Sequence, residues 1–296
     1  MRRTPAGVLL AIGILALAGA CDRPGGEPPE AAAPGPAAGL RIVTLAPHLA
    51  ELVFAVGAGD VLVGVSAYTD RPPEAAALPV VGDAFSLDQE RIAMLRPDLL
   101  LAWGGGMPAR VIEDLRARGF RVEIIETRGL GDVATALERI GELTGHVREA
   151  GRVAAEYRAD LARLAAEHAA AAPIRVFYQV SVEPLYTVNG AHYASELIES
   201  CGGHNVFDDL GRLAPMVDVE AVLARDPEVM LASADNPPDV FDVWKRWPEL
   251  AAARYDNFFF LPAGDLARPT PRLVAAGARL CAVLDQARAR RALIEK

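Results

Sequence analysis

Short apolar runs rich in β-branched residues alternate with segments of helical spacing along this chain, and this alternation constrains the fold most strongly. Up to residue 126 the expected strands are RIVTLA, VLVGVSAY, LPVVGD, DLLLAW and RVEIIE. Helical segments begin at Pro47, a residue favoured in the first turn of a helix, and at Met107. Because strands that alternate with helices form parallel βαβ units, we expect an α/β lobe over residues 40–130.

The composition changes over residues 131–172, which are rich in Ala, Leu, Glu and Arg and contain no proline. Apolar residues at helical spacing predict a long, rigid bridging helix there. Gly141, Gly145 and Gly151 weaken it locally, so a short helix followed by a long one is the other possible arrangement.

A second alternation follows over residues 173–296, with expected strands IRVFYQVS, PEVMLAS and NFFFLPA. Between and after them lie the helical segments HYASELIESCGG, DVEAVLARD and PRLVAAGARLCAVLDQARARRAL. The sequence therefore predicts an α/β fold of two Rossmann-like lobes, which a long rigid helix joins, with a ligand cleft between them.

The first residues have the features of an export signal. Two early arginines precede an apolar run from Val8 to Leu17, and small residues follow up to Cys21. Cys21 resembles the lipidated cysteine of bacterial lipoproteins, and the alternative is an ordinary cleaved signal. We expect a signal peptide over residues 1–20 and a Pro-, Gly- and Ala-rich tether over 21–39. Asp22 resembles the residue that retains such lipoproteins at the inner membrane, so we expect a periplasmic, membrane-anchored protein.

Charge and cysteine content narrow the possible partners. With a formal net charge of −9, the chain lacks the excess of Lys and Arg that nucleic acid or an anionic membrane surface would require. Membrane association is therefore expected only through the lipid anchor. In an exported chain Cys201 and Cys281 are the pair that remains once Cys21 is lipidated, so we favour a disulfide over two buried thiols.

Gly57, Gly59 and Gly64 suggest a dinucleotide loop at first sight. Such a loop follows a strand and opens a helix, because its glycines hold a pyrophosphate at the helix N-terminus. Here Gly57 and Gly59 follow a helix and precede a strand. Gly57 therefore indicates a helix C-cap, and a nucleotide site is excluded.

Ligands of open parallel sheets bind beyond the carboxyl ends of the strands, which gives a set of candidate residues. In chain order this set includes His48, Tyr68, Asp70, Asp83, Phe85, Trp103, Gln179, Tyr186, Asp265 and Arg268. Aromatic rings with a few polar groups suit a large, flat, partly polar ligand held between lobes. Trp103 has a second interpretation, as a core residue.

Four segments of the chain resemble the helical-backbone substrate-binding proteins of ABC importers. They are RIVTLAPHLAELVFAVGAGDVLVGVSAYTDRPPEA, RPDLLLAW, LIESCGGHNVF and VDVEAVLARDPEVML. Within that family it is similar to the periplasmic cobalamin binders, which share the motif S-x-Y-S/T-D-x-PP. The resemblance covers most of residues 41–284. It implies two α/β lobes joined by a rigid helix, in agreement with the pattern of elements.

The resemblance also implies residue roles. Tyr68 stands where the cobalamin binders have a ring-contacting tyrosine, Tyr186 where an aromatic lines the second lobe, and Asp265 and Arg268 where an acidic residue and an arginine meet corrin side chains. A cobalamin binder has tryptophans at the positions that Ala84 (next to Phe85), Ala214 and Leu266 occupy here. Fewer aromatic side chains are therefore expected to line the cleft of this chain. For docking to the permease, Glu220 matches one of two surface glutamates. The position of the first-lobe docking glutamate falls on Pro79, so Glu74 or Glu90 is the candidate for that role.

The function implied is capture of cobalamin or a related corrinoid by a monomeric lipoprotein and its delivery to an ABC permease and ATPase. Cobalamin is then the transported ligand, with no resident cofactor and no bound metal. The runner-up is a haem or iron–siderophore binder on the same scaffold. His48 could contact the ligand or, less readily, a metal, and His192 and His204 match no metal-binding spacing.

An enzyme is the third possibility considered. It would need a nucleophile with a base and an orienting group, and Ser181, His192 and Asp265 are the set available. No recognised hydrolase motif surrounds them, so we expect a protein without catalytic activity.

Overall fold

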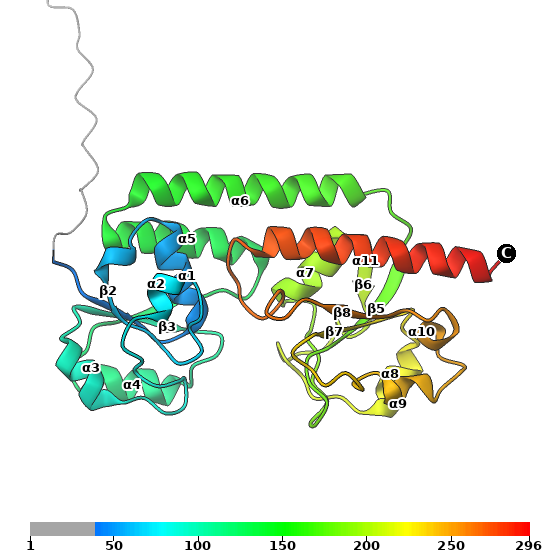
Figure 1. Cartoon of the computed structure of the whole chain (residues 1–296), viewed down its shortest axis with the longest axis horizontal. Helices are drawn as coiled ribbons and strands as arrows, with labels where there is room; N and C mark the ends of the chain where they lie inside the picture. The colour runs from blue at the N-terminus through cyan, green and yellow to red at the C-terminus, as the bar shows by residue number, and fades with distance from the viewer. Residues whose placement is uncertain (1–38) are drawn as a thin grey trace, which may run out of the picture. The chain divides into compact units, whose positions relative to one another are not determined.

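The computed structural model describes residues 39–296, and its strands form two parallel sheets of four strands each (Figure 1). The first sheet has the order β2-β1-β3-β4, with strands β1 Ile42–Thr44, β2 Leu62–Gly64, β3 Leu99–Trp103 and β4 Val122–Ile125. The second has the order β6-β5-β7-β8, with strands β5 Ile174–Gln179, β6 Gly203–Asn205, β7 Val229–Ser233 and β8 Phe258–Leu261. The expected α/β fold with two parallel sheets is confirmed. The signal peptide, Cys21 and nearly all of the tether lie outside the described residues.

Continuous apolar runs place the central strands in the core. The first four residues of β3 and of β7 are buried, as in parallel sheets that are covered on both faces. The two sheets have the same connectivity: the first and third strands of each lobe form the central pair, and the second and fourth strands lie at the edges.

The helices of the first lobe connect its strands. They are α1 Pro47–Ala55, the 3₁₀ turn η1 Gly59–Val61, α2 Pro73–Ala76, α3 Gln89–Leu95 and α4 Ala109–Ala117. Helix α1 begins with Pro47 in its first turn, as expected, and Gly57 follows its end with φ of +78°. The Gly57 amide donates to the Phe54 carbonyl at 3.0 Å, so this glycine turns the chain toward β2.

One expected strand of the first lobe is absent from its sheet. The LPVVGD segment forms only isolated bridges, a parallel one between Val65 and Val80 and an antiparallel one between Gly82 and Leu87. Pro79 has no amide hydrogen to donate, and Gly82 turns the chain with φ of +102°, so the segment is too short to continue a ladder.

The bridging segment is two helices and not one continuous helix. Helix α5 spans Leu130–Thr144 and α6 spans Val147–His168, and Gly145 between them has φ of +77°, which ends α5. Figure 1 shows α5 and α6 side by side as a hairpin. A Cβ at Gly141 would lie 2.3 Å from the Ala150 Cβ, so glycine permits this close approach. The prediction of one continuous helix was wrong, because Gly145 adopts a left-handed conformation and the chain reverses there.

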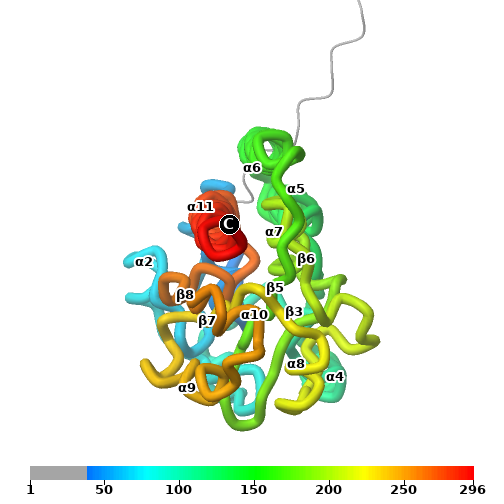
Figure 2. Tube along the Cα trace, turned by 90° about the vertical axis from the view of Figure 1, so that its right-hand side faces the viewer, coloured from blue at the N-terminus to red at the C-terminus, as the bar shows by residue number. Residues whose placement is uncertain are grey.

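The helices of the second lobe are α7 Tyr193–Ser200, α8 Val219–Arg225, α9 Asp242–Lys245, α10 Ala251–Arg254 and α11 Leu273–Ile294. Helix α6 contacts α7 and α11 as well as α5, and Figure 2 shows α11 beside α6. Strand β6, which follows the CGG sequence, is an element that the sequence pattern missed. Between residues 39 and 296, no helix combines the length and apolarity needed to cross a membrane.

Candidate ligand-binding site

The loops that follow the strands carry most of the residues expected at the ligand crevice. Tyr68 follows β2, Trp103 ends β3, and Tyr186 follows β5. Asp265 and Arg268 lie between β8 and α11. Hydrogen bonds from Arg268 to the loop after β2 join the two lobes at these strand ends.

Tyr68 and Phe85 lie on neighbouring loops of the first lobe, and each exposes 79% of its surface. The Ala67 amide donates to the Gly82 carbonyl at 2.7 Å and holds the two loops together. The Asp83 carboxylate accepts from the Phe85 amide at 2.9 Å and fixes the turn that carries this ring. Two large rings exposed on adjacent loops are suited to contact with a flat ligand.

The backbone of Tyr68 is held in an unusual conformation. Its φ is +65°, in the left-handed region that costs a non-glycine residue roughly 1–2 kcal/mol. The Arg268 Nη2 donates to the Tyr68 carbonyl at 3.0 Å and stabilises this conformation from the other lobe. A contact between lobes therefore helps to set the direction of the Tyr68 side chain.

Arg268 belongs to a cluster of four charged residues, which we call the inter-lobe ion cluster: Glu51, Asp70, Arg268 and Arg272. The Arg268 Nη1 lies 3.0 Å from the Glu51 Oε1 and also donates to Asp70. The Arg272 Nε lies 3.0 Å from the Glu51 Oε2. Burial opposes the charged form of Arg268, but its hydrogen bonds to the Asp70 and Glu51 carboxylates outweigh this effect and raise the pKa of Arg268 above its ordinary value. Burial alone would raise the pKa of Asp70, but the hydrogen bond that its carboxylate accepts from Arg268 lowers this pKa below its usual range.

Asp265 faces helix α11. Its two carboxylate oxygens accept from Arg279 at 2.6 and 2.7 Å, and its side chain is only 12% exposed. Asp265 and Arg268 therefore lie on one loop, but their side chains have different partners. In this structure Asp265 is paired within its own lobe.

The second lobe contributes an apolar surface around Tyr186. Tyr186 is half-buried and forms bridges with Ser181 and Met216. Met216 is 66% exposed, and Val180 and Val182 are each 40% exposed. Sequence reasoning missed Met216, because only the fold brings it to Tyr186. Methionine is flexible and adapts to irregular apolar ligands.

His48 and Trp103 pack against each other in the first lobe. His48 is only 2% exposed, and its ring meets Trp103 edge-on with centroids 5.0 Å apart. Burial, with a smaller effect from the positive charge of Arg268, lowers the pKa of His48 from 6.5 to about 3. Its Nε2 lies 3.4 Å from the Thr127 Oγ1. Buried Trp103 Nε1 has no hydrogen-bond partner among residues 39–296. His48 is therefore a neutral, buried imidazole behind the crevice.

The polar groups considered for catalysis have structural partners. The Ser181 hydroxyl donates to the Pro184 carbonyl at 2.6 Å, and the His192 Nδ1 accepts from the Ala194 amide as the cap of α7. Asp265 pairs with Arg279, as described above. His204 lies 3.6 Å from the Asp208 carboxylate. Across the described part of the chain, no three His, Cys, Asp or Glu residues gather as metal ligands would.

Helices α3 and α8 are equivalent elements of the two lobes, and each precedes a central strand. Asp88 caps α3 and Asp218 caps α8, each through its side chain, and each helix ends at a left-handed residue. Glu90 and Glu220 lie two residues after these caps, in the first helical turn, and both are exposed. Glu74 lies instead in the four-residue helix α2, which has no counterpart at that place in the second lobe. The geometry therefore pairs Glu220 with Glu90.

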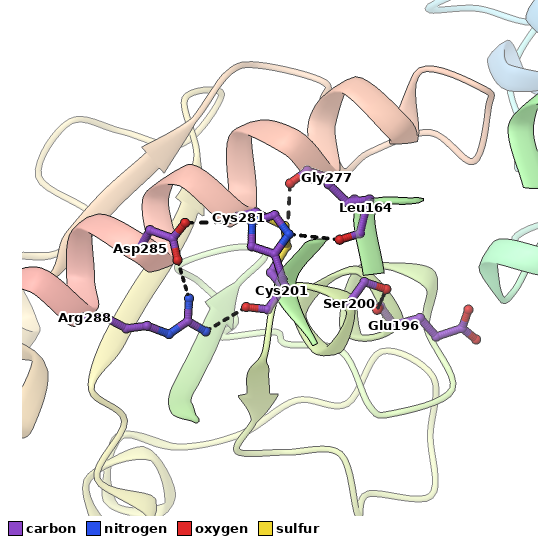
Figure 3. The surroundings of a disulfide bond; sticks show 9 residues. Leu164, Glu196, Ser200, Cys201, Gly277, Cys281, Asp285 and Arg288 are labelled. Carbon is purple, nitrogen blue, oxygen red and sulfur yellow. Dashed lines mark hydrogen bonds and ion pairs between the residues drawn. A yellow bond between two sulfur atoms is a disulfide. The ribbon is translucent and has the colours of Figure 1, made fainter. Parts of the chain in front are cut away.

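Cys201 and Cys281 form a disulfide with Sγ atoms 2.02 Å apart, which links the end of α7 to α11 (Figure 3). Arg288 donates to the Cys201 carbonyl at 2.7 Å and to Asp285 at 2.8 Å. Figure 3 shows these groups around the bridge. The disulfide lies within the second lobe.

The lobes also form the walls of a half-open pocket of about 300 Å³. First-lobe residues Gly104, Gly105 and Arg128 line it together with second-lobe residues Asn189, Ala191, Gly211 and Leu213. It lies beside the glycine loop that follows Trp103. Residues from both lobes therefore surround space at the strand ends.

Residues 42–263 match the periplasmic binding protein family. The chain belongs to this family. It is 36% identical over 245 residues to the vitamin B12-binding protein of Vibrio cholerae serotype O1, which covers 82% of this chain and 88% of that protein. The vitamin B12-binding protein of Photorhabdus laumondii is 34% identical over 254 residues, or 84% of this chain and 89% of that one.

Solved structures with the same fold include proteins of different names. The periplasmic vitamin B12 binding protein BtuF of Vibrio cholerae superposes with a TM-score of 0.76 at 36% identity, covering 84% of this chain and 97% of that one. The periplasmic heme-binding protein RhuT of Roseiflexus has a TM-score of 0.74 at 23% identity, covering 84% and 98%. The second likeness shows the fold alone.

Proposed function

We propose that this chain is the substrate-binding component of an ABC importer that captures cobalamin or a related corrinoid and delivers it to the permease and ATPase. The observation that carries this proposal is the identity of 36% with a vitamin B12-binding protein across 82% of the chain. The exposed rings of Tyr68 and Phe85 on the first lobe, and the exposed Met216 beside Tyr186 on the second, support it because they offer apolar contacts to a flat macrocycle. No catalysis and no resident cofactor are part of the proposal.

The site residues form three groups in this proposal. Tyr68, Phe85 and Tyr186 contact the corrin directly, and Arg268 binds its polar side chains. His48 supports the crevice from behind, because it is 2% exposed, and Trp103 is partly exposed and packs against it. Asp265 acts on the ligand only after it exchanges part of its pairing with Arg279.

A haem binder is the second candidate. Solved heme-binding proteins have the same fold at 20–24% identity. A neutral buried imidazole at His48 does not offer an exposed ligand to iron, and this favours the corrinoid.

The protein works in the periplasm as a monomer in this proposal, held at the inner membrane by a lipid on Cys21. Family membership supports the periplasm, and the small residues before Cys21 support the anchor. Glu220 and Glu90 dock to the permease, one from each lobe. Their equivalent places on α3 and α8 support Glu90 over Glu74.

The decisive experiment mixes the purified chain with cyanocobalamin and, separately, with haemin. Calorimetry gives the affinity, and the visible spectrum reports the environment of each macrocycle. We expect micromolar or tighter binding of cobalamin and none of haemin. The opposite preference would overturn the corrinoid proposal and support the haem binder.

A further inference from the structure

We infer that Glu51 is a positioning residue, which holds Arg268 and the Tyr68 loop in place across the lobe boundary and so determines the affinity for the ligand. This inference rests on the proposed function for its ligand and on the structure for its geometry. The sequence pattern gave Glu51 no role, because it lies inside helix α1 among apolar residues.

The placement of Glu51 is fixed by its helix. Residues His48 to Val53 of α1 are buried, and the Glu51 side chain is only 8% exposed. A buried carboxylate is costly unless it is paired, and here each oxygen has a guanidinium within 3.0 Å. Glu51 is therefore a rigid negative charge at the edge of the first lobe.

Both guanidinium groups come from the second lobe. Arg268 lies in the loop after β8, and Arg272 caps the start of α11. Glu51 thus holds this loop at two points that are four residues apart in the sequence. The loop also carries Asp265, so the cluster fixes a segment that contains two expected ligand contacts.

Arg268 carries this constraint back to the first lobe. It donates to the Tyr68 carbonyl at 3.0 Å and to the Asp70 carboxylate. Asp70 is 63% exposed, and exposed ion pairs contribute little, so Asp70 alone would not fix Arg268. The buried Glu51 is the strong partner, and the left-handed conformation of Tyr68 depends on it through Arg268.

Glu228 offers a matched control in the same chain. Its side chain is also 8% exposed and also meets two arginines, with Arg291 at 2.7 Å and Arg175 at 3.5 Å. Arg175 lies on β5 and Arg291 on α11, so all three groups belong to the second lobe. Glu228 has the chemistry of Glu51 without the link between lobes.

The test compares Glu51→Gln and Glu228→Gln with the full wild-type chain. Cobalamin affinity is measured by calorimetry, global stability by urea unfolding, and local order without ligand by amide hydrogen exchange. We expect Glu51→Gln to weaken binding about tenfold, since a hydrogen bond to a charged group is lost between positioned residues. Exchange should become faster over residues 65–72 and 264–271. Glu228→Gln should lower stability while affinity and exchange in both segments stay at the wild-type level.

Arg272→Gln is the second variant, because Arg272 is 42% exposed and its loss leaves the fold intact. It should weaken binding about threefold, less than Glu51→Gln, because Arg268 keeps its partner.

If amide hydrogen exchange over residues 65–72 and 264–271 is unchanged in a folded Glu51→Gln protein, the inference is overturned, whatever the ligand proves to be. Equal loss of affinity in Glu51→Gln and Glu228→Gln would also overturn it. Failure of the wild type to bind cobalamin would refute the proposed function, and the exchange data would still decide the role of Glu51.

Discussion

Tyr68 combines two properties that rarely occur together, a ring that is 79% exposed and a backbone with positive φ. An exposed ring adds little to folding, and a left-handed tyrosine costs stability, so neither property is explained by the folded state alone. The ligand contact that we propose for Tyr68 would account for both properties. Strained residues of this kind occur at binding sites because the surrounding structure holds them there.

Replacing Tyr68 with glycine should separate stability from binding. Glycine adopts positive φ without strain and loses only an exposed side chain, so the free energy of unfolding should change by less than about 1 kcal/mol. Cobalamin affinity should fall at least tenfold because the ring is lost. Urea unfolding and calorimetry measure the two effects. Tyr68→Phe is the control and should bind nearly as well as wild type; equal binding by the glycine variant would refute contact through the ring.

His48 should make the stability of this protein depend on pH. Its pKa is lowered from 6.5 to about 3 in the folded state, so between these values the unfolded chain takes up a proton that the folded chain does not. Stability therefore falls as the pH drops from 6.5 toward 3. From pH 7.5 to pH 5 this group should cost about 2 kcal/mol.

The measurement is urea unfolding of the wild type and of His48→Gln at both pH values. The wild type should lose about 2 kcal/mol more than the variant. His192, whose pKa burial lowers to about 4, acts in the same direction and remains in both proteins, so it cancels in the comparison. An identical loss in the two proteins would show that His48 is protonated in the folded state.

At the scale of elements, α3 and α8 present one carboxylate from each lobe at equivalent positions. Glu90→Ala and Glu220→Ala should leave cobalamin affinity unchanged, because both side chains lie on exposed helix starts. Each should reduce uptake of labelled cobalamin into vesicles that contain the permease and ATPase. Glu74→Ala is the control with normal uptake. A transport defect confined to Glu74→Ala would instead support α2 as the docking element.

The disulfide ties α7 to α11 across a separation of 80 residues. Removing such a bridge restores entropy to the unfolded chain and should lower the free energy of unfolding by about 4 kcal/mol. The double variant Cys201→Ser/Cys281→Ser tests this by urea unfolding. The fold should persist, because Arg288 still joins the end of α7 to α11 through the Cys201 carbonyl. A loss below 1 kcal/mol would mean that the bridge adds little to stability.

At the scale of the whole molecule, helix α6 limits the movement between lobes. It packs against α5 of the bridging hairpin and against α7 and α11 of the second lobe, with Ala150, Ala154, Tyr157 and Leu164 buried. Packed helices slide by small amounts, whereas flexible strand hinges permit large closure.

We therefore expect cobalamin to change the distance between the lobes by only about a few ångströms. Spin labels at exposed residues Ala117 and Glu249, in a Cys21→Ser background, would measure this distance by pulsed resonance with and without ligand. The distance distribution should also be narrow without ligand. A broad distribution, or closure on the order of 10 Å, would contradict a rigid connection.

Much of this organisation was predictable because local pattern determines it. Apolar runs of strand length, a proline at the start of α1 and a glycine after its end are read from adjacent residues. The site was predictable in part for the same reason, since ligand loops follow strand ends. Tyr68, Phe85 and Arg268 were predicted as site residues in this way, and their role in ligand contact stays a prediction.

What the sequence by itself determined was the α/β class, the two lobes and the loops that follow the strand ends, because these depend on periodicity within each element. Only the tertiary structure decided that Gly145 folds the bridge into a hairpin, that Asp265 pairs with Arg279, and that Met216 joins Tyr186. It also decided that Glu51 lies between two arginines more than 200 positions away. Such contacts arise from packing between distant segments, and no local pattern encodes them.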